Sequence, residues 1–182
     1  MRRFYLPGLY EPGDDVRLEA SEARHAVRVL RLSPGERIEI LDGIGNRSAA
    51  VIEKIEGESV IARVTEKILA PPPALTLTLA MAFLKSDKMD FVINSATQLG
   101  ISSFVPFSAK RCVSRPGSER IETRLKRWER IVHEAVKQCG LSVTPSIARP
   151  VDLDGLCSLG KKHDLALAFW EEDTAPLSPS LF

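Results

Sequence analysis

A mostly apolar run followed by a helical repeat of apolar positions marks the middle of the chain. The run Leu75–Leu84 is long enough for a buried strand. Apolar residues then recur at helical spacing over Met89–Leu99, and Gly100 follows them, where a helix commonly ends. Ile101–Phe107 returns to a short β-like run. This order predicts a strand, a helix and a second strand parallel to the first.

Polar residues follow the first of these predicted strands. Ser86 and Asp87 both carry side chains that can cap the start of the helix. Lys85 stands directly after the strand, and ligands of parallel sheets collect beyond the carboxyl ends of the strands. Lys85 is therefore the first residue that we expect to take part in function.

Short apolar segments separated by turn residues fill the first part of the chain. Strands are expected over residues 2–6, 16–19, 36–41, 51–55 and 60–65. Three prolines at 71–73 cannot donate ladder hydrogen bonds and favour an extended linker. We therefore predict a small β-barrel over residues 1–72 and a second domain over residues 73–182.

One helix interrupts the predicted strands of the first domain. It is expected over Ser21–Leu32, and Arg24, Arg28 and Arg31 give it a largely basic surface. His25 lies between these arginines. A lone histidine is more often structural than functional, and the alternative is a contact with an RNA phosphate or base.

The second domain continues with alternating helices and strands. Helices are expected over 119–139 and 153–159, and further strands over 145–148 and 164–170. Together with the central unit, this predicts an α/β domain of four strands and two or three helices. A parallel sheet needs cover on both faces, so we expect part of the covering layer to lie outside this chain, which ends at Phe182.

The bulk composition excludes several classes of protein. The 182 residues are 44% hydrophobic and 27% charged, with a net charge of +1, as in ordinary globular proteins. Cys112, Cys139 and Cys157 are scattered and lack CxxC spacing, which argues against a disulfide framework or a zinc site. No apolar run has the length of a signal-peptide core at the N-terminus or of a membrane span. We expect a cytoplasmic protein without a metal or a membrane partner.

Basic residues concentrate within residues 110–130. This stretch holds eight basic and three acidic residues, and such a density suits a phosphate backbone. The alternative is a solvated helix face with ion pairs such as Glu122 with Lys126. Glu134 and Gln138 are four residues apart on the same predicted helix, so they either reach one polar ligand together or face solvent.

A series of short segments keeps one order and spacing over nearly the whole chain. The segments are His25 with Val29-Leu30-Arg31, Asp42-Gly43, Lys85-Ser86-Asp87-Lys88-Met89, Ala96–Ile101 with Pro106, Lys110-Arg111, Arg127-Trp128 with Ile131, Glu134-Ala135, Gln138-Cys139-Gly140 and Pro145. Together they resemble bacterial SPOUT-superfamily enzymes that methylate N3 of a uridine in 16S ribosomal RNA. Two departures are Gln98, where the family favours glutamate, and Leu141, where it favours arginine.

The resemblance implies a PUA-like RNA-binding β-barrel up to residue 72, followed by a SPOUT-type α/β domain with a parallel sheet. It implies a homodimer that acts on ribosomal RNA of the small ribosomal subunit and binds S-adenosylmethionine in a C-terminal knot. The knot signature of the family is expected after Phe182, so the resemblance implies an incomplete SPOUT domain with no cofactor-binding residue in this chain. It names no catalytic residue. The RNA-binding residues that it implies are His25, Arg28, Arg31, Lys85, Arg111, Glu134 and Gln138.

The sequence is compatible with three functions from different classes. The first is an S-adenosylmethionine-dependent methyltransferase. The second is a non-catalytic RNA-binding fragment of the same family, which could not bind the cofactor. The third is an unrelated small-molecule α/β enzyme. Binding of S-adenosylmethionine separates the first two, and RNA affinity that falls steeply with salt separates both from the third.

Overall fold

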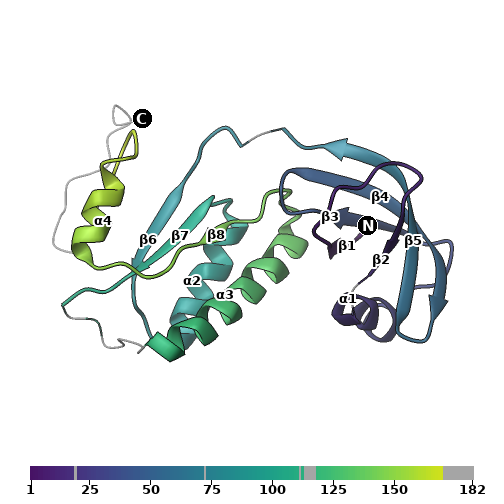
Figure 1. Ribbon diagram of the computed structural model, residues 1–182, viewed down its shortest axis with the longest axis horizontal. Helices are drawn as coiled ribbons and strands as arrows, with labels where there is room; N and C mark the ends of the chain where they lie inside the picture. The colour runs from purple at the N-terminus through teal and green to yellow at the C-terminus, as the bar shows by residue number, and fades with distance from the viewer. Residues whose placement is uncertain (19, 72, 111, 113–117, 170–182) are drawn as a thin grey trace.

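A computed structural model of the protein describes residues 1–18, 20–71, 73–110, 112 and 118–169. The described chain forms a β domain next to an α/β domain (Figure 1). This confirms the predicted fold class of a β-rich N-terminal domain followed by an α/β domain with a parallel sheet. None of the helices in these ranges is long and apolar enough to cross a membrane.

The β domain is one five-stranded sheet that wraps around its own core. Buried and more exposed positions alternate in β5, where Val60, Ala62 and Val64 point inward, because successive side chains of a strand face opposite sides. The strands run in the order β1-β3-β4-β5-β2. They are β1 (Arg2–Tyr5), β2 (Asp15–Arg17), β3 (Arg37–Leu41), β4 (Asn46–Glu56) and β5 (Ser59–Leu69).

The basic helix differs from its prediction over Ser21–Leu32. It consists of α1 (Ala20–Arg24) and a π-helical turn, η1 (His25–Val29). Arg31 then adopts a left-handed conformation, with φ of 53°, and the amide of Leu32 donates to the carbonyl of Ala26 at 3.0 Å. Because the helix ends here, Leu32 packs in the core of the β domain. The free energy gained by burying this leucine favours the turn over a longer helix.

The α/β domain contains the parallel strands that the central pattern predicts. Strands β6 (Thr78–Ala82), β7 (Ser103–Phe107) and β8 (Ser146–Ile147) pair in the order β6-β7-β8, all parallel. The apolar faces of α2 (Ser86–Gln98) and α3 (Ser118–Cys139) share a core with the sheet. That core is centred on Trp128, Phe104, Ile93, Met89 and Val132. The short α4 (Leu153–Gly160) follows β8.

Two details of this domain correct the sequence analysis. The N-cap of α2 is Lys85, whose side chain makes no capping hydrogen bond, so Ser86 and Asp87 lie inside the first helical turn rather than capping it. The strand expected over 164–170 is wrong for its described residues: 164–169 are irregular and largely exposed. An apolar run forms a strand only when a neighbouring strand takes its hydrogen bonds, and the described sheet therefore has three strands rather than four.

The two domains are joined by more than the segment between β5 and β6; the predicted boundary at residue 72 lies outside the described residues. Leu41, at the end of β3, is fully buried in the core of the α/β domain. Two backbone bonds, Gly45 N to Ser142 O at 3.0 Å and Thr144 N to Gly43 O at 2.8 Å, tie the turn after β3 to the segment before β8. These contacts set the relative position of the domains.

Candidate functional site

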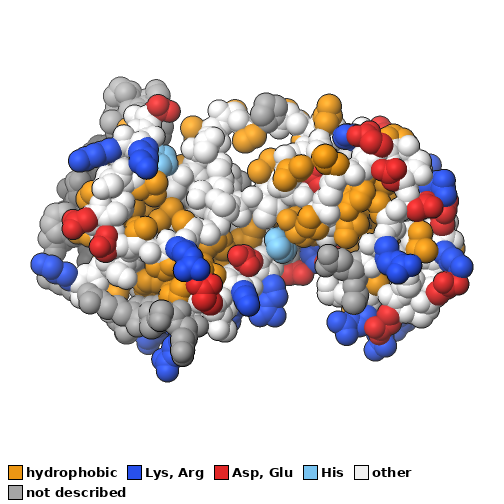
Figure 2. Space-filling view, viewed as in Figure 1, with side chains coloured by type: hydrophobic (Ala, Val, Ile, Leu, Met, Phe, Trp, Pro, Cys, Tyr) orange, Lys and Arg blue, Asp and Glu red, His pale blue; other side chains and the backbone are white. Residues whose placement is uncertain are grey.

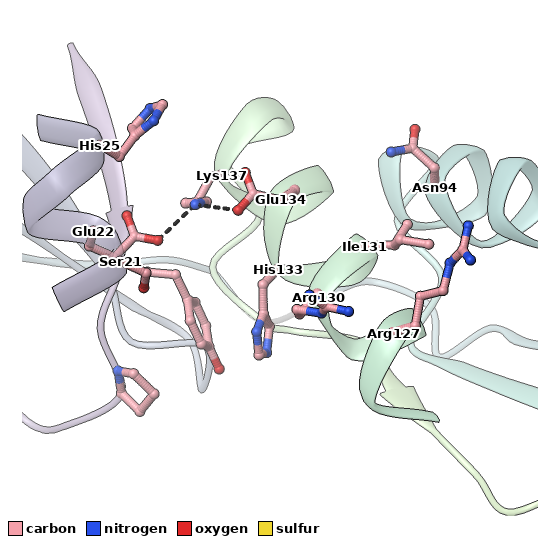
Figure 3. A pocket seen from close by; sticks show the side chains of 12 residues that line it. Ser21, Glu22, His25, Asn94, Arg127, Arg130, Ile131, His133, Glu134 and Lys137 are labelled. Atoms are coloured by element: carbon pink, nitrogen blue, oxygen red, sulfur yellow. Dashed lines mark hydrogen bonds and ion pairs between the residues drawn. The ribbon is translucent and has the colours of Figure 1, made fainter. Parts of the chain in front are cut away.

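A cleft of about 730 Å³ lies between the helix of the β domain and helix α3 (Figure 3). In the space-filling view, basic side chains border the notch between the two domains on both sides (Figure 2). The size falls within the range of small-ligand sites. The residues that line it are Tyr5, Pro7, Ser21, Glu22, His25, Asn94, Arg127, Arg130, Ile131, His133, Glu134 and Lys137.

Lys137 connects the two walls of the cleft. Its ammonium group lies 2.7 Å from a carboxylate oxygen of Glu22 on α1 and 2.7 Å from one of Glu134 on α3. The side chains of Lys137 and Glu22 are only 11% and 12% exposed, whereas Glu134 is largely exposed. The Lys137–Glu22 pair is therefore a largely desolvated ion pair between the domains.

Burial and charge act on the pKa of Lys137 in opposite directions. Burial is the largest single influence and would lower the pKa of this amine. Hydrogen bonds to Glu134 and Glu22, together with their negative charges, outweigh it and raise the pKa of Lys137 above its ordinary value. Lys137 is therefore positively charged at neutral pH and neutralises much of the acidic charge beside it.

His133 forms part of the floor of the cleft. Its ring stacks on Tyr5 of β1, with the ring centroids 4.2 Å apart and the planes inclined by 22°. Burial, the largest influence, lowers the pKa of His133 below its ordinary value of 6.5, against the opposing effect of Glu129. The imidazole is therefore uncharged at neutral pH and gives the cleft a flat, weakly polar surface.

Two arginines form the basic part of the wall. Arg127 pairs with Asp90 of α2. Arg130, one helical turn further along α3, is exposed and forms no ion pair with any residue within the described ranges. A free guanidinium at the edge of a cleft is suited to bind a phosphate or carboxylate in a bidentate manner.

The structure brings together two of the residues implied as RNA-binding by the resemblance. His25 and Glu134 lie on opposite walls of the cleft. Arg28 points elsewhere and pairs with Glu58 at 2.5 Å. Arg31 is exposed beyond the π-helical turn and does not line the cleft.

The other three residues of that set lie apart from the cleft or outside the described residues. Lys85 is exposed at the start of α2, beyond the carboxyl end of β6, and is not part of the wall. Gln138 is exposed, and its backbone oxygen accepts a hydrogen bond from Arg3. Arg111 is outside the described residues.

Most of the residues that line the cleft were not predicted from the sequence. Arg127, Arg130, Glu134 and Lys137 recur at three- and four-residue spacing, which places them on one helix face, and this stripe was an available signal. Nothing local pointed to Glu22, which lies 115 positions from its partner Lys137.

The chemistry of the cleft favours binding of a polar anion over metal chemistry. No group of three His, Cys, Asp or Glu side chains converges anywhere in the described ranges. The carboxylates of Glu22 and Glu134 are already bonded to Lys137. The groups still open to a ligand include the exposed guanidinium of Arg130, the uncharged imidazole ring of His133, and Oε2 of Glu22, which has no partner among the described residues.

Comparison with known protein families gives two matches that divide the chain as its two sheets do. Residues 18–65 match a family described as the RNA methyltransferase PUA domain. Residues 71–181 match a family described as the RNA methyltransferase domain. Helices α1 and α3, which face each other across the cleft, therefore lie within these two matches.

Curated relatives and solved structures agree with these matches. The ribosomal RNA small subunit methyltransferase E of Mycobacterium bovis is 30% identical over 79% of this chain and 55% of the relative. The enzyme of that name from Neisseria gonorrhoeae, solved with S-adenosyl methionine, is 31% identical, with a TM-score of 0.77 over 84% of this chain and 63% of its own. A Legionella pneumophila methyltransferase solved with bound SAM is 28% identical, with a TM-score of 0.80 over 86% and 65%. The chain thus spans little more than half the length of the curated relative.

Proposed function

Because the chain belongs to the RNA methyltransferase family, we propose that the protein transfers a methyl group from S-adenosylmethionine to N3 of a uridine in small-subunit ribosomal RNA. The observation that carries this proposal is the match of residues 71–181 to the methyltransferase domain directly after the PUA domain match at 18–65. The names of the relatives support the choice of small-subunit ribosomal RNA.

The geometry of the cleft supports RNA as the substrate. It lies between the segment matching the PUA domain and the segment matching the methyltransferase domain, with the exposed guanidinium of Arg130 at its edge. N3 of a uridine is engaged in pairing within a duplex, so the base must be unpaired or splayed out to react. Following the family resemblance, we also propose RNA contacts at His25, Arg28, Arg31, Lys85, Arg111, Glu134 and Gln138, of which His25 and Glu134 line this cleft.

The cleft does not fit the methyl donor. S-adenosylmethionine carries a sulfonium cation, whereas the exposed guanidinium of Arg130 at this wall suits an anion such as a phosphate. When bound to the enzyme, the cofactor supplies the methyl group, but no described residue is assigned to hold it. The cleft is therefore a site for RNA rather than for the cofactor.

The remaining parts of the proposal follow the family resemblance. The substrate is ribosomal RNA or the assembled small ribosomal subunit, the site of action is the cytoplasm, and the active form is a homodimer. The free state of Cys112, Cys139 and Cys157 is compatible with a reducing compartment.

A methyl-transfer assay tests the proposed function. The protein is incubated with methyl-labelled S-adenosylmethionine and small subunits that lack the modification, and labelled nucleosides are identified by mass spectrometry. Labelled N3-methyluridine supports the proposal. RNA binding without cofactor binding or transfer would favour the non-catalytic RNA-binding alternative. A lack of both RNA binding and transfer would overturn the proposal and favour an unrelated enzyme.

A further inference from the structure

One polar atom of the cleft wall has no partner within the described chain. Glu22 is a buried residue, and its Oε1 is bonded to Lys137 at 2.7 Å. Its other oxygen, Oε2, is buried and makes no hydrogen bond to any residue that the structure describes. In Figure 3 this second oxygen lies on the side of His25, away from Lys137. A buried carboxylate oxygen without a donor is costly, so a ligand that supplies a donor recovers this cost.

The surroundings of Oε2 restrict the kind of ligand. Glu22 lines the cleft, and the last torsion of a glutamate is broad, so a partial turn of the carboxylate can present Oε2 to a ligand there while Oε1 stays near Lys137. Across the cleft Arg130 offers a guanidinium to an anion. Elsewhere in the cleft wall, Tyr5, Ile131 and the uncharged His133 provide flat or apolar surface. An RNA nucleotide combines all three features: an anionic phosphate, a flat base and hydrogen-bond donors.

We propose that Glu22 accepts a hydrogen bond from an unpaired uridine nucleotide of the RNA held in this cleft, while Arg130 contacts a flanking phosphate. The inference rests on the proposed function and deepens it, because it names the residue that reads the nucleotide. Two groups of such a nucleotide donate: the 2′-hydroxyl of its ribose and N3–H of its base. Both present the same chemistry to Glu22.

A carboxylate that accepts a hydrogen bond from RNA and one that only repels RNA have opposite effects on RNA affinity when they are removed. Removal of any acidic group near a polyanion is expected to tighten binding slightly. Glu22→Gln should do the opposite and weaken binding of a single-stranded oligouridylate about tenfold, because the charged acceptor is lost. Glu129→Gln, which removes an exposed carboxylate from α3 outside the cleft wall, is the matched control and should bind as tightly as the wild type or more tightly.

Three fluorescent oligonucleotides of equal length and sequence identify the donor: oligouridylate, its 2′-deoxy analogue and its N3-methyl analogue. Affinities for the whole 182-residue chain are measured by fluorescence anisotropy at one salt concentration. The analogue that lacks the true donor should bind the wild type about tenfold more weakly and should bind Glu22→Gln no more weakly than oligouridylate does. A loss with the deoxy analogue assigns the 2′-hydroxyl, and a loss with the methyl analogue assigns N3–H.

Several outcomes would overturn the inference while leaving the proposed function intact. One is tight binding of oligouridylate by the wild type with equal or tighter binding by Glu22→Gln. Another is an equal loss for an analogue in both proteins. The wild-type protein alone also tests the inference, whether or not Glu22→Gln folds. If it binds both analogues as tightly as oligouridylate, Glu22 accepts no hydrogen bond from the nucleotide. Failure of the wild type to bind any RNA would overturn both the inference and the proposed function.

Discussion

The guanidinium of Arg3, in the first strand, donates a hydrogen bond to the backbone oxygen of Gln138 at 3.1 Å and thereby ties the β domain to the last turn of α3. The same side chain pairs with the buried carboxylate of Glu39 at 2.9 Å. Arg47 reaches the other oxygen of Glu39 at 3.3 Å. Arg3 therefore both neutralises a buried charge and caps a helix end of the neighbouring domain.

Arg3→Ala should lower the free energy of unfolding by about 2 kcal/mol, because it leaves Glu39 with a single cationic partner and the end of α3 without its donor. Urea unfolding measures this change. Arg2→Ala is the control, since Arg2 is exposed in the same strand, and its effect should stay within about 0.5 kcal/mol. Equal losses in the two variants would show that the Arg3 contacts do not hold the domains together.

Gly43→Ala should destabilise the protein more than Gly57→Ala. Both glycines have positive φ, so each substitution costs about 1 kcal/mol in backbone strain. A Cβ at position 43 would also lie 2.7 Å from the hydroxyls of Thr144 and Tyr5, whereas position 57 is open. Thermal unfolding of the two variants tests this, and similar melting temperatures would mean that the turn after β3 is not locked against the α/β domain.

Stability should decrease with acid partly because of His133. Burial above all lowers the pKa of this ring in the folded state, so the unfolded chain, with the ordinary pKa of 6.5, takes up the proton first. The contribution of His133 is therefore present above pH 6.5 and is lost as the pH falls through the lowered pKa of the folded state. His133→Phe keeps a ring against Tyr5 but cannot bind a proton.

Urea unfolding at several values between about pH 8 and pH 5 checks this prediction. The free energy of unfolding of His133→Phe should fall less toward low pH than that of the wild type. His25→Gln, which replaces an exposed histidine of the same cleft, is the control and should follow the wild-type curve more closely. Parallel curves for the wild type and His133→Phe would contradict the role given to burial of this ring.

Arg31→Asn should separate RNA binding from stability. Asparagine tolerates the left-handed conformation that Arg31 adopts, with φ of 53°, so stability should stay equal or rise. Loss of one cation should weaken RNA binding and reduce the slope of log affinity against log salt by about 1. Filter binding over a salt series measures both quantities, with Arg2→Asn as the control. An unchanged slope would remove Arg31 from the RNA-binding surface.

Local pattern was sufficient for most of the elements. The change from strand-like to helical spacing after Leu84 predicted β6 and α2, and a long apolar repeat predicted α3 almost to the residue. These predictions succeed because side chains must meet a core at the period of the backbone that carries them. Residues 164–169 are an exception, because an apolar run does not form a strand where no described strand pairs with it.

The sequence by itself determined the fold class, the order of the domains and the family resemblance that the comparisons confirm. It also placed His25 and Glu134 among the residues of interest, but not across one cleft. Only the tertiary structure decided that Glu22 and Lys137, 115 positions apart, form a buried pair with one oxygen left over. The physical reason is range: periodicity reports how each segment faces its own core, whereas a site between two domains depends on how those cores are packed together.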